Sequence, residues 1–420
     1  MVPISPPSGR PRLLFLSQTL PYPPDGGVKI RTFNILRLLA RTFDIKALCF
    51  YRTKGGLLKT DVREAVRGLS DLADVETFPI PQEQSRTRLL WDHSRSLVQQ
   101  RAYTVFSYQS REFERRLRDL LQREPFDLVH ADSLDMSYYF PLVRGLPLVC
   151  THHDAQSAAL ARRAGIESSA FRRRYVAHQA RLTKEEEQRW CPLVTLNVAV
   201  SDVDAEKLRN IAPAARFTVV PNGVDTDYFR PPETAGQGDI VFVGGTTWYP
   251  NKDAMDYFTS TILPILKEKG ATRRVAWVGR ASPQEIDRYH REFGITLTGY
   301  VEDIRPLVHA ASCYIVPIRI GGGTRVKILD AWAMGCAIVS TTIGCEGLSA
   351  RDGQNILIRD DPEEFAVAVA NLLADPLLRE RLGQEGRRTA IAEYSWEALE
   401  PKLRSAYLAL LSDRRALGTS

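Results

Sequence analysis

Short hydrophobic runs alternate with longer segments of helical periodicity along the whole chain. In the first half, the runs that predict strands are residues 12–17, 45–50, 127–130, 147–151, 193–196, 198–201 and 217–220. A helix is predicted between the first two runs, from Ile30 to Thr42. Strands separated by helices are typical of a parallel, doubly wound α/β sheet.

The alternation is interrupted at the proline- and glycine-rich residues 231–238 and then begins again. After this break, the predicted strands are 239–244, 275–279, 295–299, 314–317 and 337–340, with helices near 254–269, from 324 onward and from 362 onward. We therefore expect two Rossmann-like domains, 1–230 and 239–395, joined by a linker at 231–238. Ligand sites are expected at the carboxyl ends of the strands and in a cleft that the two domains face.

The last segment, 396–420, is predicted to carry one amphipathic helix. Its apolar positions are Trp396, Leu399, Leu403, Tyr407 and Leu410. This spacing places them on one face of a helix. The helix either closes the second domain or crosses back to the first.

Composition narrows the class of protein. Of the 420 residues, 44% are hydrophobic and 25% are charged, as in ordinary globular proteins. The six cysteines include no C-x-x-C pair, which favours free thiols in a reducing compartment over disulfides or a zinc site. The N-terminus lacks the basic-then-apolar order of a signal peptide, and no apolar run reaches the ~18 residues that span a bilayer. A cytoplasmic location is therefore expected.

Positive charge is concentrated in the first half of the chain. Residues 1–235 hold 34 Lys and Arg against 27 Asp and Glu, whereas the remainder holds 22 against 23. Arginine clusters at 162–163 and 172–174 contribute to this excess. Such clusters attract anionic lipid headgroups or anionic polymers. Such clusters are more often solvated helix faces, and peripheral contact with the inner face of the cell membrane is the functional alternative.

The segment from Gly321 to Gly335 carries most of the functional information. Three glycines precede a predicted helix that Thr324 can cap with its hydroxyl. Basic residues are unfavourable in the first turn of a helix, yet Arg325 and Lys327 lie there. An anion such as phosphate explains this placement, because free N–H groups and cations converge at the helix start. The alternative is an ordinary glycine-rich turn before a core helix.

Asp330 follows one turn after Lys327 and can accept hydrogen bonds from neutral hydroxyls. A diphosphate beside hydroxyl groups describes a nucleotide sugar. The segment therefore predicts a nucleotide-sugar site at the start of this helix.

Each half also has a glycine-rich turn directly after its first strand. These turns contain Gly26 and Gly27 in the first half, and Gly244 and Gly245 followed by Lys252 in the second. Glycine allows the backbone to approach a bulky anion closely, although turn geometry alone also explains it. Neither turn is a G-x-G-x-x-G dinucleotide fingerprint, and the chain has no P-loop.

Further polar residues follow predicted strands. His153 and its neighbour Asp154 come just after the strand 147–151. A histidine there can bond a sugar hydroxyl or accept a proton, with the aspartate orienting it. Asn222 lies in a turn at the end of the first half, and Tyr300 and Val301 follow another strand, where their segment can contact a base. Each position also has a purely structural explanation as a turn or cap.

Together, these residues resemble the retaining nucleotide-sugar glycosyltransferases of family 4, which have the GT-B fold. The most specific matches are Val220–Asp225, Phe242–Gly245 with Pro250–Asn251, Gly299–Asp303 and Gly321–Gly335 with Ile338–Thr341. The order and spacing of these four segments agree with the family over nearly the whole chain. The resemblance implies transfer of a sugar from a nucleoside diphosphate to a glycan or lipid-linked acceptor in polysaccharide or glycoconjugate biosynthesis.

The resemblance also implies a role for each matching position. Gly26 and Gly27 would contact the diphosphate or transferred sugar, and His153 would bond the donor sugar near the reaction centre. Lys252, Arg325 and Lys327 would neutralise the diphosphate, while Asp330 would hold the ribose hydroxyls. The donor would lie mainly on the second domain and the acceptor on the first, with the leaving phosphate itself taking the acceptor's proton.

No cofactor or metal ion is expected. A diphosphate leaving group needs its developing charge stabilised, and a helix dipole with Arg and Lys can supply this. The sequence offers no D-x-D segment for a cation, and a nucleic-acid partner is not expected either.

The chain departs from the family in one motif. The family has two glutamates separated by seven residues, and here the second is shortened to Asp330 while the first is replaced by Gly322. The arginine that commonly follows the Gly244 strand has no clear counterpart. The identity of the donor sugar therefore cannot be carried over. Two alternatives stay open: a GT-B epimerase or phosphorylase, and a catalytically silent subunit that binds a sugar nucleotide.

Overall fold

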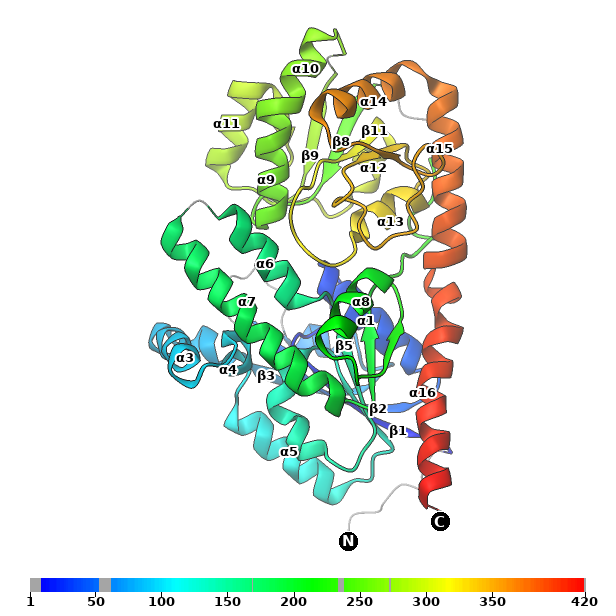
Figure 1. Ribbon diagram of the computed structural model, residues 1–420. Coiled ribbons are helices and arrows are strands. Elements are labelled where there is room, and N and C mark those ends of the chain that lie inside the picture. Colours follow the sequence, from blue (N-terminus) through cyan, green and yellow to red (C-terminus); the bar gives the residue numbers. More distant parts are fainter. Residues whose placement is uncertain (1–8, 53–61, 168, 233–237, 272, 419–420) are drawn as a thin grey trace. The chain divides into compact units, whose positions relative to one another are not determined.

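The computed structural model describes residues 9–52, 62–167, 169–232, 238–271 and 273–418. Backbone contacts divide the chain into two compact units. Unit 1 comprises Met1–Val220 with Glu400–Ser420, and unit 2 comprises Pro221–Leu399. Each unit has its own sheet and its own helices (Figure 1). The domain boundaries drawn from the sequence remain a prediction.

Unit 1 is built on a seven-stranded sheet in which every strand pair is parallel. The strand order is β3-β2-β1-β4-β5-β6-β7. The strands are β1 (Arg12–Ser17), β2 (Asp44–Tyr51), β3 (Asp74–Pro79), β4 (Leu128–Ala131), β5 (Leu148–His152), β6 (Leu196–Ala199) and β7 (Phe217–Val219). The central strands are buried almost throughout, because helices that cover both faces of a parallel sheet require continuous apolar runs.

The helices of unit 1 connect these strands. They are α1 (Gly27–Leu39), α2 (Val62–Arg67), α3 (Arg86–Gln99), α4 (Tyr103–Ser107), α5 (Arg111–Arg123), α6 (Gln156–Ile166), α7 (Ala170–Trp190) and α8 (Asp202–Ile211). Short 3₁₀ turns lie at Pro81–Gln84, Leu134–Val143 and Cys191–Leu193. Serine hydroxyls cap several helices: Ser110 accepts from the amide of Phe113 at the start of α5, and Ser201 does so for Asp204 in α8.

Unit 2 has a six-stranded parallel sheet of order β10-β9-β8-β11-β12-β13. Its strands are β8 (Asp239–Val243), β9 (Val275–Val278), β10 (Ile295–Leu297), β11 (Ala311–Val316), β12 (Ile338–Ser340) and β13 (Leu357–Ile358). Its helices are α9 (Tyr249–Tyr257), α10 (Leu263–Glu268), α11 (Pro283–Phe293), α12 (Arg305–His309), α13 (Val326–Ala333), α14 (Pro362–Ala374) and α15 (Pro376–Thr389). π-helical turns at Phe258–Ile262 and Ala390–Tyr394 follow α9 and α15. The core of unit 2 is centred on Trp277 and Trp332, which are both fully buried.

The last helix, α16 (Trp396–Gly418), begins in unit 2 and continues in unit 1 from Glu400 onward. Within unit 1 the hydroxyl of Tyr407 forms a hydrogen bond of 2.7 Å with Nδ1 of His130 in β4. The Tyr407 ring also meets Phe43 edge-on, with 6.1 Å between ring centroids. Tyr407 is fully buried, so this helix supplies part of the core of unit 1.

The two predicted parallel sheets are confirmed, with corrections to individual elements. Residues 193–196 and 198–201 are not two strands: a 3₁₀ turn ends at Leu193, and a single strand, β6, follows. Strands β3 and β13 were not predicted. No helix of the described residues is both long and apolar enough to cross a bilayer.

The packing of α15 against the turn after α13 leaves no room for a side chain at Gly383. A Cβ atom built there would collide with the carbonyl oxygen of Gly335, which is backbone and cannot move aside. Gly383→Ala is therefore expected to lower the free energy of unfolding by about 1–3 kcal/mol, the usual cost of overpacking. Thermal denaturation would measure this loss. Gly165→Ala in α6, where a Cβ would meet open space, is the matched control and should stabilise slightly. An equal effect of both substitutions would contradict the packing argument.

Candidate functional site

The strand order of unit 2 determines where a ligand is expected. From β8 the chain adds β9 and β10 on one side of the sheet, and then β11, β12 and β13 on the other. The reversal falls between β8 and β11. Crevices at the carboxyl ends of strands beside such a reversal are the usual ligand sites of open α/β sheets. Gly244 follows β8 there, and the glycine loop that leads into α13 follows β11.

Lys327 lies in the first turn of α13, and its ammonium is held against the β8 turn. Its Nζ donates to Oδ1 of Asn251 at 2.8 Å and lies 3.9 Å from the centroid of the Phe242 ring. Burial and the nearby charge of Arg325 lower the pKa of Lys327 well below its usual range. Among the described residues, no carboxylate forms an ion pair with this ammonium.

Asp330 lies one turn further along α13 and is partly buried. Burial raises the pKa of its carboxyl to about 7. The described residues form no hydrogen bond or ion pair with this carboxylate. The helix therefore presents a cation and a carboxylate that are both desolvated and that have no partner of opposite charge in the described part of the chain.

Gly244 and Gly245 have no side chains because the loop passes directly over neighbouring groups. Gly244 has a φ of 153°, and a Cβ on it would lie 2.6 Å from the Nζ of Lys327. A Cβ on Gly245 would lie 2.7 Å from the carbonyl oxygen of Arg280. Asn251 closes the turn by donating from Nδ2 to the carbonyl oxygen of Gly245 at 3.0 Å. The structure thus brings the predicted Gly244 turn and Lys327 together.

Thr324 does not cap α13, contrary to the prediction. The helix begins at Val326, its N-cap position is Arg325, and no side chain caps it. The Thr324 hydroxyl instead accepts a hydrogen bond of 2.6 Å from Nδ2 of Asn222. The contact brings the turn with Asn222 next to the start of α13, as expected for two residues of one site.

Arg325 is buried and turned back onto its own loop. Its guanidinium donates to the carbonyl oxygens of Gly322, Gly323 (3.0 Å) and Ile320 (3.3 Å). Three carbonyl acceptors hold the loop in a fixed bend, which Gly321 permits with a φ of 111°. In this conformation Arg325 organises the glycine loop, and its predicted role at the diphosphate stays a prediction.

Lys252 is engaged elsewhere in the described structure. Its Nζ forms an i,i+4 ion pair with Asp256 at 3.1 Å and lies 3.4 Å from the hydroxyl of Tyr289. Lys252 therefore contacts Asp256 and Tyr289, whereas Lys327 contacts Asn251 in the turn region after β8.

Arg280 belongs to the same sheet edge and was missed in the sequence. It follows β9 immediately, and its guanidinium lies 4.7 Å from the centroid of the Tyr300 ring. Gly279 before it has a φ of 144°, and a Cβ there would lie 2.5 Å from the amide nitrogen of Gly245. Tyr300 is exposed, whereas Val301 packs against the core of unit 2. In the sequence, the glycine–arginine pair directly after this strand could have indicated Arg280 as a candidate site residue.

Unit 1 has a corresponding reversal between β1 and β4. The loop after β1 ends at Gly26, which is the N-cap of α1, and a Cβ on Gly26 or Gly27 would meet open space. Lys29 forms an ion pair of 3.0 Å with Asp25 just ahead of this helix start. The loop after β4 begins with Asp132.

Asp132 is the partner of His153, a role that the sequence suggested for Asp154. His153 Nε2 lies 2.7 Å from the backbone oxygen of Asp132 and 3.6 Å from its Oδ2. Because a carbonyl oxygen only accepts, Nε2 must carry the proton, which leaves Nδ1 as an acceptor in the neutral ring. His152 is structural: it bonds Asn197 at 2.9 Å, and burial lowers its pKa to about 4.

The Asp132 carboxylate is itself held by a buried network. Oδ2 accepts from the hydroxyls of Thr32 at 2.6 Å and Ser17 at 3.4 Å. Burial would raise the pKa of Asp132, but His153 and His130 more than offset it and hold that pKa below its usual range. Ser17 ends β1 and Thr32 lies on α1, so the network fixes the loops of the reversal in place.

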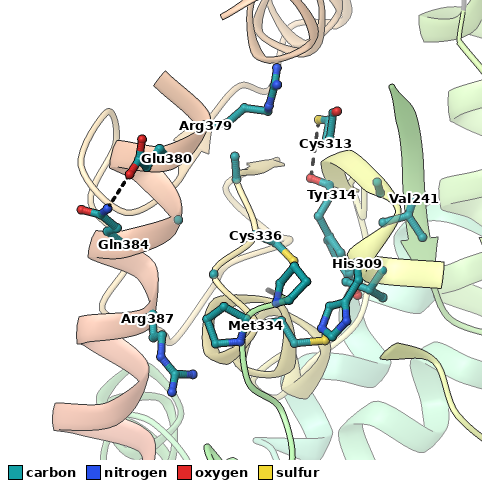
Figure 2. Close-up of a pocket in the computed structure, with 18 of the residues that line it drawn as sticks. Val241, His309, Cys313, Tyr314, Met334, Cys336, Arg379, Glu380, Gln384 and Arg387 are labelled. Carbon is teal, nitrogen blue, oxygen red and sulfur yellow. Dashed lines mark hydrogen bonds between the residues drawn. The ribbon is translucent and has the colours of Figure 1, made fainter. Parts of the chain in front are cut away.

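A cavity of about 450 Å³ lies at the opposite edge of the unit 2 sheet (Figure 2). Its lining includes the starts of β11 and β12 and one face of α15. The charged side chains of α15 in this lining are already engaged. Arg379 donates to the carbonyl oxygen of Leu372 at 2.7 Å, and Glu380 accepts from Gln384 at 3.0 Å. The cavity therefore does not provide the polar groups of the predicted site.

Two glycosyltransferase family models match the chain. The model described as Glycosyltransferase Family 4 matches residues 25–228, and the model described as Glycosyl transferases group 1 matches residues 237–375. Together they include every predicted site residue.

Curated relatives match parts of the chain. A lipopolysaccharide core biosynthesis glycosyltransferase of Rhizobium meliloti is 32% identical over 140 residues, which is 31% of this chain and 40% of the relative. A GDP-mannose-dependent phosphatidylinositol monomannoside mannosyltransferase of Mycolicibacterium smegmatis is 29% identical over 227 residues, covering 48% of this chain and 58% of the relative. The chain thus spans about half the length of these relatives.

Among solved structures, Anabaena HepE in complex with UDP superposes with a TM-score of 0.65 at 14% identity. The superposition covers 95% of this chain and 100% of HepE. At this identity the likeness establishes the fold, which is GT-B. With both halves matched by glycosyltransferase models and the GT-B fold in place, the chain belongs to the family 4 glycosyltransferases.

Proposed function

We propose that the protein is a retaining glycosyltransferase that moves a sugar from a nucleoside diphosphate sugar to a glycan or lipid-linked acceptor, in polysaccharide or glycoconjugate biosynthesis. The donor binds at the carboxyl edge of the unit 2 sheet. The diphosphate lies against the Gly244 turn and the start of α13, without a metal ion or other cofactor. The acceptor binds to unit 1.

One observation carries this proposal: Lys327 and Asp330 are both desolvated, and neither has a partner of opposite charge among the described residues. A buried charge is expensive unless a partner compensates it. A diphosphate provides the anion that Lys327 lacks, and ribose hydroxyls provide the donors that Asp330 lacks. A nucleoside diphosphate has both groups in one molecule, so it satisfies both residues at once.

The chemistry follows from the same charges. As the sugar–phosphate bond breaks, negative charge grows on the diphosphate, and preorganised donors that face this charge lower the barrier. Lys327, the N–H groups at the start of α13 and the Gly244 turn supply these donors, while Arg325 holds the glycine loop. In unit 1, His153 with a free Nδ1 accepts a hydrogen bond from a hydroxyl of the transferred sugar.

The similar proteins support the two ligand classes. Anabaena HepE is described in complex with UDP, and the Mycolicibacterium relative is described as GDP-mannose-dependent and as acting on a phosphatidylinositol mannoside. We propose that the acceptor of this protein is also held in a lipid layer, and that the protein works at the inner face of the cell membrane. UDP and GDP are accordingly the nucleotides to test.

UDP or GDP is expected to raise the temperature of thermal unfolding, because a ligand that binds only the folded state stabilises it. Differential scanning fluorimetry with each nucleoside diphosphate, in the presence of a chelator, measures the shift. The corresponding nucleoside, which has no phosphate, is the control and should shift the midpoint much less. If no nucleoside diphosphate shifts it, the donor-site assignment is wrong.

Lys327→Ala is expected to slow sugar transfer by more than ~100-fold, since the substitution removes a cation that stabilises the leaving group. The readout is turnover of the donor that a mass-spectrometric screen identifies with a pool of cell-extract acceptors. Lys269→Ala, at an ion pair with Glu363 on the surface of unit 2, is the matched control and should transfer at the wild-type rate. A wild-type rate in Lys327→Ala would refute the role of this lysine.

Nucleotide binding without turnover by the wild-type protein would favour the silent-subunit alternative. The observation behind that alternative is Gly322, which stands where the family has a sugar-binding glutamate and whose carbonyl oxygen accepts from Arg325. Donor screening therefore has to precede the mutant kinetics.

Asp330→Asn is expected to stabilise the ligand-free protein at alkaline pH. The pKa of Asp330 is raised to about 7 in the fold, so ionisation costs stability as the pH rises from about 4, the unfolded value, to about 7. The variant should gain about 1–2 kcal/mol near pH 8 and little near pH 4. Denaturant titrations at the two pH values measure the difference. A gain that does not depend on pH would contradict the raised pKa.

A further inference from the structure

Helix α3 in unit 1 buries two polar side chains and exposes most of its large apolar ones. The carboxylate of Asp92 and the hydroxyl of Ser96, one turn apart, are fully buried. Asp92 accepts from Nε of Arg88 at 2.9 Å, and Ser96 accepts from Nε2 of Gln179 in α7 at 2.9 Å. These bonds fix the rotation of the helix, because turning it over would leave the buried polar groups without partners.

The opposite face of α3 is an apolar stripe in solvent. Leu90 is 67% exposed, Trp91 is 62% exposed and Val98 is 83% exposed, and Leu97 completes the stripe. The spacing i, i+1, i+7 and i+8 places the four side chains on one side of the helix. No carboxylate occurs on this face, since Asp92 is the only acidic residue of α3 and it is buried.

Helix α7 continues this surface. His93 on α3 forms a hydrogen bond of 2.6 Å with the hydroxyl of Tyr175 on α7. Phe171, which is 85% exposed, lies one turn before Tyr175 on the same helix face. Between them lie the exposed residues Arg172, Arg173 and Arg174, whose guanidinium groups form no ion pair among the described residues.

We propose that Leu90, Trp91, Leu97 and Val98 of α3, with Phe171 and the Arg172–Arg174 cluster of α7, form a surface that docks on an anionic lipid bilayer. The apolar side chains enter the headgroup boundary, and the three arginines pair with lipid phosphates. This is the composition of a helix that lies in a membrane interface, with Trp and Leu on one face beside uncompensated Arg.

Charge decides between a membrane and a second copy of the chain. Residues 155–184 carry seven Arg and Lys against the single carboxylate of Glu167. A two-fold symmetric dimer through this surface would bring the same arginine cluster against itself, whereas an anionic bilayer neutralises it. The inference rests on the proposed function for its purpose, a lipid-held acceptor. Its test needs neither donor nor turnover, so the two can fail separately.

The test is co-sedimentation of the full chain with phosphatidylcholine vesicles, with and without phosphatidylglycerol. The wild type should bind the anionic vesicles, and raised salt should weaken the binding. The double variant Leu90→Glu/Val98→Glu should reduce the partition coefficient at least about tenfold, since charges replace interfacial apolar groups. Arg172→Ala/Arg173→Ala/Arg174→Ala should reduce it on anionic vesicles only. Leu377→Glu in α15 of unit 2, where the leucine is 76% exposed, is the matched control and should bind as the wild type does.

Intrinsic fluorescence gives a second readout that does not depend on charge substitution. Vesicle binding should shift the emission of Trp91 to the blue, Trp91→Phe should bind but lose this shift, and Trp248→Phe should keep it. The proposal is overturned if anionic vesicles do not bind the wild type, or if the Leu90→Glu/Val98→Glu variant binds them equally well. A dimer in solution that this variant dissociates would also overturn it, because a second copy would then cover the stripe.

Discussion

The ammonium of Lys327 is buried where the described protein supplies only an amide oxygen and an aromatic ring. The surroundings of the site follow from this placement. Gly244 has no side chain because a Cβ would collide with Nζ, and Asn251 uses its oxygen for Lys327 and its nitrogen for the loop backbone. The first turn of α13 is thereby tied to the turn after β8.

The two units share the same reversal of strand order but place different polar groups beside it. In each, the chain reverses its direction of strand addition beside the first strand, and polar groups gather at the carboxyl ends of the two strands that flank the reversal. In unit 2 these groups include the Lys327 ammonium, with which no carboxylate of the described residues forms an ion pair. In unit 1 the central group is the Asp132 carboxylate, whose Oδ2 accepts from the hydroxyls of Thr32 and Ser17, while its Oδ1 accepts no hydrogen bond from the described residues. The central polar group at this edge is thus a carboxylate in unit 1 and the Lys327 ammonium in unit 2.

Much of the fold could be predicted because its central strands are continuous apolar runs. Strand β1 was predicted from Arg12 to Ser17, as it occurs. The misses are edge strands: β3 is mostly half-buried and contains Asp74 and Glu76, and β13 has two residues, so neither shows the signal of a buried strand. Residues 193–201 were divided wrongly because the apolar Leu193 lies in a 3₁₀ turn outside the sheet.

The candidate site could be predicted where its residues are close in the sequence, and its contacts could not be predicted where distant segments meet. The glycine turns, Lys327 and Asp330 could be read from spacing alone. Asp132 could not, because its partner His153 is 21 residues away and the contact depends on how β4 and β5 pair. Local preference predicts that Thr324 caps the helix, but its hydroxyl accepts a hydrogen bond from Asn222, 102 residues earlier. Arg280 was overlooked because its importance arises only when β9 aligns with β8.

The hydrogen bond between Tyr407 and His130 joins residues 277 positions apart, both fully buried in unit 1. The chain completes all of unit 2 between the two partners. During synthesis unit 2 can therefore fold as a continuous segment while unit 1 still lacks a piece of its core, although unit 1 leaves the ribosome first. His130 can therefore form its hydrogen bond with the Tyr407 hydroxyl only after α16 has been synthesised. Unit 1, although most of it precedes unit 2 in the chain, is therefore completed after unit 2.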